Sequence, residues 1–174
     1  MKKIVLTFGL LAGVVMSALM VLAMLFKDQI GFDKGLVVGY TSMVLAFLMV
    51  YFGVRSYRDG VAGGQVSFGR AFKVGILITL LATACYVATW QVIYYNFMPD
   101  YLDKYAAYSL EKAKASGATE AQLAEESTKM KEFAEAYQNP LINIAYTSLE
   151  PLPVGIVLTL VTAGVLSRKR REPV

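Results

Sequence analysis

Histidine is absent from the 174 residues of this chain, and cysteine occurs only once, at Cys85. Without histidine there is no imidazole to act as a general base, to complete a Ser-His-Asp site or to ligate a metal. Cys85 has no partner for an intrachain disulfide and lies inside an apolar run, where a thiol behaves as a small hydrophobic side chain. We therefore expect a protein that is not an enzyme and that holds no metal or cofactor.

Charge is also scarce, because charged residues make up 17% of the chain and hydrophobic residues 56%. A soluble domain of this length carries more charge and alternates apolar with polar residues. Here the apolar residues come in long blocks, at about 4–26, 36–54, 71–98 and 141–167. Since about 20 apolar residues cross the hydrocarbon core of a bilayer, the sequence predicts an all-α membrane protein with four transmembrane helices in a single membrane domain.

The first apolar block follows two lysines and resembles a signal peptide in outline. It is longer than a typical signal core, no clear cleavage site follows it, and a charged pair comes directly after, so we interpret it as an uncleaved first span. Gly9, Gly13 and Ser17 recur on one face of this helix. Small residues at that spacing let another helix approach closely, which is explained either by a dimerisation face or by internal packing.

A short, basic, glycine-rich loop, residues 55–75, is predicted between the second and third spans, after a polar turn at 27–34 between the first and second. Four cations in the basic loop are candidate contacts for an anion or a lipid headgroup. They are Arg55, Arg58, Arg70 and Lys73. The alternative is a tight turn whose charges only set the orientation of the chain in the membrane.

The hydrophilic segment 99–140 carries eight acidic and five basic residues, a net charge of −3. It is predicted to be a helical hairpin between spans three and four. Gly117 is expected to end its first helix, and Thr119 with Gln122 matches the capping box of a second helix. The charged faces are most simply explained as faces in contact with water.

Charge bias predicts the orientation. The N-terminus, the basic loop and the C-terminal stretch 168–171 are positive, whereas the hairpin is net acidic. Because positive segments stay on the cytoplasmic side, we expect a multi-pass protein of the bacterial inner membrane with both termini in the cytoplasm. The hairpin is then extracytoplasmic, and membrane lipids are the immediate partners.

Glu150 is the strongest candidate for a functional residue, because an ionisable side chain within an apolar run is costly to desolvate. Pro151 and Pro153 follow it, and they either kink one helix or start a new one. Helix arithmetic places four further side chains at a similar depth, where they line an outward-facing polar mouth or form an interfacial aromatic belt. These are Tyr40, Trp90, Gln91 and Tyr94.

Two segments, SYRDGVAGGQVSFGRAFKVG and LEPLPVG, together with the four-span layout, resemble a bacterial membrane family catalogued as domain of unknown function 4199. The resemblance covers nearly the whole chain. The loop positions that match the family pattern are Tyr57, Arg58, Gly64, Ser67, Phe68, Gly69, Ala71, Phe72, Lys73 and Gly75. The resemblance implies a four-helix inner-membrane protein without an established activity, and it supplies no catalytic residue.

These observations favour a structural or accessory membrane component that acts through a partner, either a second copy of the chain or another membrane protein. Nothing in the sequence suggests a nucleic-acid partner. The alternative is a small oligomeric transporter or channel subunit that uses Glu150 and the outer aromatic cluster. Four spans are few for a transporter, so this alternative requires oligomerisation.

Overall fold

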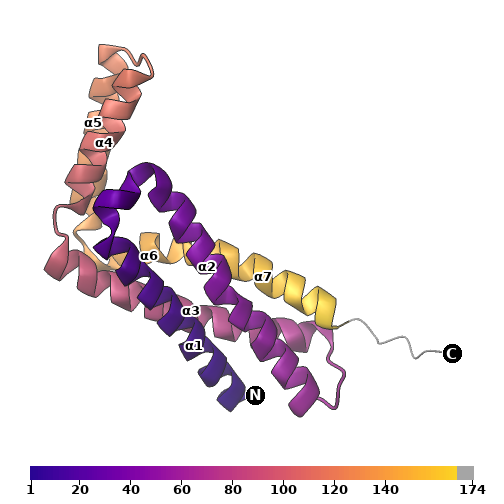
Figure 1. The fold of residues 1–174 in the computed structure, drawn as a ribbon. Helices are drawn as coiled ribbons and strands as arrows, with labels where there is room; N and C mark the ends of the chain where they lie inside the picture. The colour runs from indigo at the N-terminus through magenta and orange to yellow at the C-terminus, as the bar shows by residue number, and fades with distance from the viewer. Residues whose placement is uncertain (168–174) are drawn as a thin grey trace. The chain divides into compact units, whose positions relative to one another are not determined.

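The structure of the protein is a computed structural model that describes residues 1–167, and within that range all regular structure is helical (Figure 1). The basic stretch predicted at 168–171 lies outside the described residues. The helices are α1 (Lys2–Leu25), α2 (Lys27–Gly60), α3 (Phe68–Phe97), α4 (Tyr101–Ala115), α5 (Glu120–Tyr137), α6 (Pro140–Leu149) and α7 (Pro151–Leu166).

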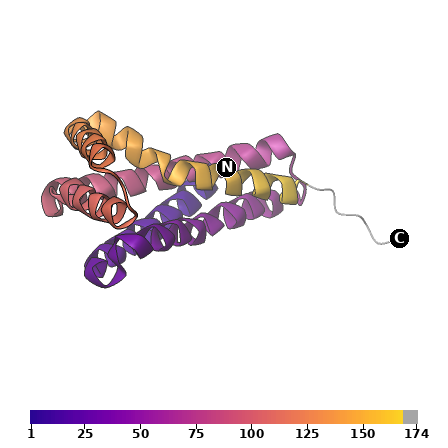
Figure 2. The same ribbon diagram turned by 90° about the horizontal axis from the view of Figure 1, so that it is seen from above.

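The chain divides into two compact units. Among the described residues, the first contains 1–87 and 148–167, and the second contains Ala88–Thr147. Helix α3 therefore contributes its first part to one unit and its last part to the other. In the first unit α1 packs on α2, and α2 packs along α7 (Figure 2).

Four helical segments are long and apolar enough to cross a membrane. They are Lys2–Leu25, Gln29–Gly60, Phe68–Phe97 and Pro140–Leu166. Their outward side chains are apolar as well, since Val14 is 64% exposed and Val37 is 68% exposed. Soluble proteins rarely expose large continuous apolar surfaces. The prediction of a four-span, all-helical protein is thus confirmed.

Glycines bring the spans of the first unit into close contact. A Cβ atom added at Gly9 would lie 2.7 Å from Leu81 Cδ2, and one added at Gly13 would lie 2.6 Å from Cys85 Cβ. The glycine face of α1 is therefore occupied by α3, which supports internal packing over a dimerisation face. Gly75 on α3 approaches Thr159 on α7 in the same way.

Two predicted boundaries are wrong. The polar turn predicted at 27–34 is almost entirely helical, with its break at Gly31, where φ is 65° and ψ is 170°. The basic loop predicted at 55–75 is reduced to residues 61–67, because α2 continues to Gly60 and α3 begins at Phe68. Lysine and arginine are good helix formers, so a helix that leaves the apolar region continues through basic residues until a glycine pair stops it. Gly63 and Gly64 have φ values of 67° and 84°.

The second unit contains the hairpin predicted from the sequence. Gly117 adopts a φ of 85° after α4. The Thr119 hydroxyl accepts from the Gln122 backbone N–H at 3.3 Å, and the Gln122 side-chain oxygen accepts from the Thr119 backbone N–H at 2.9 Å. Helices α4 and α5 pack against each other. Among residues 99–140, all of which the structure describes, no large apolar side chain is exposed.

A new helix begins at Pro151, and Pro153 lies within its first turn. Helix α6 ends at Leu149 and α7 begins with Pro151 at its first position. Proline is favoured there because its missing N–H would have no partner within the helix. Only Glu150 interrupts the helical run, and its own backbone is right-handed helical, with φ −75° and ψ −58°.

Candidate functional site

Glu150 lies at the junction of α6 and α7 and binds a tyrosine of α3 within the first unit. The Tyr86 hydroxyl donates a hydrogen bond of 2.7 Å to Glu150 Oε2. The Glu150 side chain is exposed, whereas the next residue, Pro151, is fully buried. This hydrogen bond orients the Glu150 carboxyl group at the start of α7.

The other four side chains predicted at this depth fall into different units. Tyr40 lies on α2 in the first unit and is 47% exposed. Trp90, Gln91 and Tyr94 lie on the last part of α3, in the second unit. The structure brings these three together and adds partners that the sequence did not indicate.

A chain of hydrogen bonds connects α3, α5 and α6 within the second unit. The Trp90 indole N–H donates to the Tyr137 hydroxyl at 2.9 Å, and that hydroxyl lies 2.9 Å from Thr147 Oγ1. Thr147 in turn donates to Asn143 Oδ1 at 3.1 Å. The Asn143 side-chain oxygen can only accept, so the single hydroxyl proton of Thr147 is used there. Tyr137 must therefore donate to Thr147, and this fixes the direction of the hydrogen bonds from Trp90 to Asn143.

Asn143 ends this chain and is the most buried member, with none of its surface exposed. Its Oδ1 also accepts from Gln91 Nε2 at 2.6 Å, while its Nδ2 has no hydrogen-bond partner. A buried donor without a partner costs about 1–3 kcal/mol. Tyr94 is also buried and packs beside these hydrogen bonds, with its ring edge-on to Tyr137 at a centroid distance of 5.3 Å.

The sequence carried a signal for part of this chain. Asn143 and Thr147 are polar residues one helical turn apart inside an apolar run, which indicates one shared polar face. The pairing of that face with Trp90 and Tyr137 depends on contacts between distant segments. The same holds for the Tyr86 partner of Glu150.

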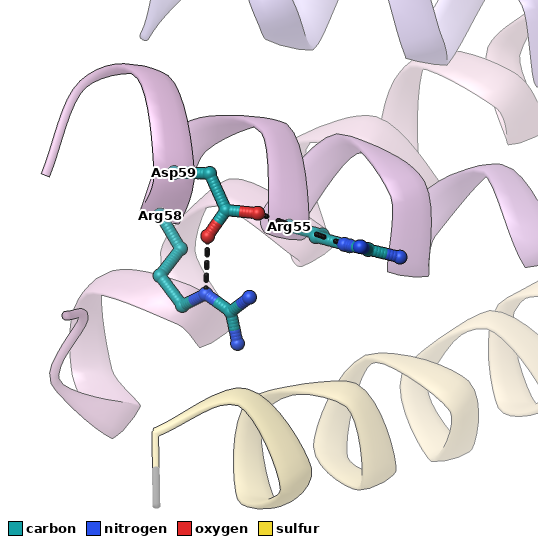
Figure 3. A network of polar contacts seen from close by, with 3 residues as sticks. All are labelled: Arg55, Arg58 and Asp59. Atoms are coloured by element: carbon teal, nitrogen blue, oxygen red, sulfur yellow. Dashed lines mark hydrogen bonds and ion pairs between the residues drawn. The ribbon is translucent and has the colours of Figure 1, made fainter. Parts of the chain in front are cut away.

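The four candidate headgroup contacts lie on two helices rather than in one loop. Arg55 and Arg58 belong to the last turns of α2, and Arg70 and Lys73 to the first turns of α3. Asp59 joins the first two (Figure 3). Arg58 Nε donates to Asp59 Oδ1 at 2.7 Å, while Arg55 Nε lies 3.6 Å from Asp59 Oδ2.

Within residues 1–167, no three carboxylates or thiols come together in the way that a metal site requires. A family model described as "Protein of unknown function (DUF4199)" matches residues 7–168. The chain belongs to this family. No curated protein and no solved structure matches it. The four candidate spans describe a multi-pass membrane protein, and the family description assigns no activity.

Proposed function

We propose that this protein is a non-catalytic accessory component of the bacterial inner membrane and that it acts through a protein partner bound by the α4–α5 hairpin. The observation that supports this most is the length of the hairpin, which is far greater than a connection between two spans requires. Seven residues, 61–67, connect α2 to α3, whereas 42 residues, 99–140, separate the third apolar block from the fourth. Long connections in compact proteins commonly have a role beyond closing the chain.

The hairpin is also built as a folded element. Its turn uses a left-handed glycine and a complete capping box, and its second helix carries ion pairs such as Lys129 with Glu125 at 2.6 Å. Its exposed surface is polar. A rigid, charged surface of this kind suits recognition of a partner with complementary charge.

Orientation is part of the proposal. Lys2, Arg55, Arg58, Arg70 and Lys73 fall at the ends of α1, α2 and α3 that the chain order brings to one side of a membrane. The positive-inside bias puts that side in the cytoplasm. The hairpin, with its net charge of −3, is then outside the cytoplasmic membrane, and both termini are inside.

The proposal is tested by purification from native membranes in mild detergent. The full chain is compared with a variant in which residues 101–137 are replaced by a short Gly-Ser linker. We expect a stoichiometric partner, or a homo-oligomer of defined size, with the full chain and its loss with the shortened one. A monomeric full chain, or a partner retained after the hairpin is removed, would contradict the proposal.

The Tyr86–Glu150 hydrogen bond favours a second candidate function, a small oligomeric transporter or channel subunit. Ionisable groups in membrane segments commonly mark ion or substrate paths. In proteoliposomes Glu150→Gln would then abolish a flux that the parent protein carries, while Glu111→Gln on α4 would leave it unchanged. The absence of flux in the parent under varied ion and pH gradients would dismiss this candidate.

A further inference from the structure

The charged end of α2 borders a hollow in the surface of the first unit. The hollow has a volume of about 450 Å³. Its lining residues are Phe8, Met49, Phe52, Arg55, Ser56 and Asp59. Phe8 belongs to α1 and the other five to α2, so the hollow follows the line along which these two helices pack.

The lining changes in character along α2. Met49 and Phe52 give way to Arg55, Ser56 and Asp59 within ten residues, a rise of about 15 Å. The candidate span that contains them ends at Gly60. The polar end of the hollow therefore lies where the span leaves the hydrocarbon, and the apolar end lies within it. A molecule that matches this gradient has a polar head and an apolar tail.

The polar end offers both a donor and an acceptor. Asp59 Oδ1 is engaged by Arg58 at 2.7 Å, but Asp59 Oδ2 lies 3.6 Å from Arg55 Nε. That distance is too long for a strong hydrogen bond, so Oδ2 retains capacity to accept and Arg55 retains donors. The Asp59 side chain is 47% exposed and the Arg55 side chain is 54% exposed. A phosphate suits Arg55, and a primary ammonium suits Asp59.

We propose that this hollow binds a glycerophospholipid with a phosphoethanolamine headgroup, taken from the surrounding bilayer. Arg55 donates to the phosphate, Asp59 Oδ2 accepts from the ammonium, and Phe8, Met49 and Phe52 contact the first part of an acyl chain. A choline headgroup has no ammonium N–H to donate, and a glycerol headgroup has no positive charge. Both therefore satisfy Asp59 less well. The site is independent of the partner role proposed for the hairpin.

The test is a competition for the purified full chain. The protein is reconstituted in bilayers of equal parts phosphatidylethanolamine, phosphatidylcholine and phosphatidylglycerol, and the lipids that remain bound after gentle extraction are quantified by mass spectrometry. We expect phosphatidylethanolamine to be enriched about two- to fivefold over the other two, the upper part of the range for one exposed charge-assisted contact. Asp59→Asn should abolish this enrichment, since the amide is neutral.

Two matched variants separate the site from general effects. Asp103→Asn makes the same chemical change on α4 and should leave the enrichment intact. Phe52→Ala removes a 44% exposed ring without touching the charges. It should lower retention of all three lipids about two- to threefold while preserving their order, and it keeps the proposal testable if Asp59→Asn does not fold.

Equal retention of the three lipids by the parent protein would mean adventitious boundary lipid only and would overturn the proposal. A preference for phosphatidylglycerol that persists in Asp59→Asn would also overturn it, because Arg55 alone would then attract any anionic lipid. A full-length chain that purifies as a monomer without a partner, but keeps the lipid enrichment, would refute the proposed function and leave this site standing.

Discussion

The four candidate spans and the α4–α5 hairpin expose different side chains and are held together by different contacts. The spans present valine, leucine and isoleucine to their surroundings, and the hairpin, residues 99–140, exposes no large apolar side chain. Each surface matches one solvent, hydrocarbon in the first case and water in the second. Different parts of one chain therefore fold in different solvents and are stabilised by different interactions.

The interiors follow the same division. In the first unit the spans approach through glycines, and the Thr79 and Thr159 hydroxyls lie 3.1 Å apart between α3 and α7. In a membrane, helices associate through close packing and interhelical hydrogen bonds, because the hydrophobic effect does not drive them together there. The hairpin relies on local devices, a capping box and ion pairs one turn apart. Substitutions that disturb packing between the spans should therefore destabilise the protein most. Substitutions that remove a cap or an ion pair in the hairpin should destabilise it least.

The largest effect is expected at Gly155 on α7. A Cβ atom there would collide with the Thr79 methyl group and would lie 2.9 Å from Phe47 Cζ. We expect Gly155→Leu to destabilise the protein by about 3 kcal/mol, the upper range of overpacking. The measurement is heating in detergent micelles with a fluorogenic maleimide, which reports exposure of the single thiol, Cys85.

Gly164→Leu is the matched control for that experiment, because Gly164 lies on the same helix and a Cβ there meets nothing within 4 Å. It should change the unfolding temperature little. Similar decreases in the unfolding temperature of both variants would show that the helices do not pack as described.

A smaller effect is expected from the hydrogen-bonded chain of the second unit. Tyr137→Phe removes the hydroxyl that joins Trp90 to Thr147, leaving the buried Trp90 indole N–H without an acceptor. We expect a loss of about 1–3 kcal/mol, measured by the same thiol assay and by loss of amide protection in α5 and α6. Tyr146→Phe, at a 49% exposed ring, should cost less than about 0.5 kcal/mol. An equal loss of stability in both variants would contradict a stabilising role for the hydrogen bonds that link Trp90, Tyr137 and Thr147.

The capping box should contribute less to stability than the hydrogen bonds of Tyr137 do. Thr119→Ala removes the side-chain acceptor for the Gln122 N–H, and caps of this kind contribute about 1 kcal/mol. Hydrogen exchange should speed up at the first amides of α5 and stay unchanged at its end. Thr128→Ala, inside the exposed part of the same helix, should stabilise α5 slightly because alanine is the better helix former. Faster exchange throughout α5 in both variants would contradict a local role for the cap.

The smallest effect is expected from the pair of Glu125 with Lys129. The hydrogen bond from Lys129 lowers the pKa of Glu125 and raises the pKa of Lys129. The stabilisation is therefore complete above the ordinary carboxyl pKa of 4.5 and is lost as the pH falls through the lowered folded value. At alkaline pH it is lost again as the pH rises through the raised pKa of Lys129.

Unfolding of the parent protein and of Glu125→Gln, compared at pH 7 and at about pH 3, tests this pair. The difference between the two proteins should shrink at the acidic pH. Both side chains are exposed, so the difference should be small even at pH 7. A difference that grows on acidification would contradict the assignment.

Local signals made much of this fold predictable. Apolar block length indicated the spans, and Gly117 with the Thr119–Gln122 pair indicated the hairpin turn, because each depends on residues close in sequence. Helix ends in basic segments were not predictable, since arginine and lysine continue a helix as readily as they end it. Arg55 therefore lies on α2 and not in a loop.

The side-chain partners were the least predictable part. Glu150 stood out by its charge and Trp90 by its place near an interface, but neither residue indicates its partner. Tyr86 lies 64 positions from Glu150, and Tyr137 lies 47 positions from Trp90. Such pairs are set by how the helices pack, and no spacing rule connects residues that far apart.

Labelling of introduced cysteines in intact spheroplasts tests the central claim most directly. In a Cys85→Ala background, Glu125→Cys probes the hairpin, Val61→Cys the loop at 61–67, and Leu45→Cys the lipid-facing side of α2, where Leu45 is 53% exposed. An impermeant maleimide should label the hairpin position at once and the loop position only after the membrane is opened. It should label the span position in neither case. Labelling of Val61→Cys in intact spheroplasts, or of Leu45→Cys from water, would contradict the account.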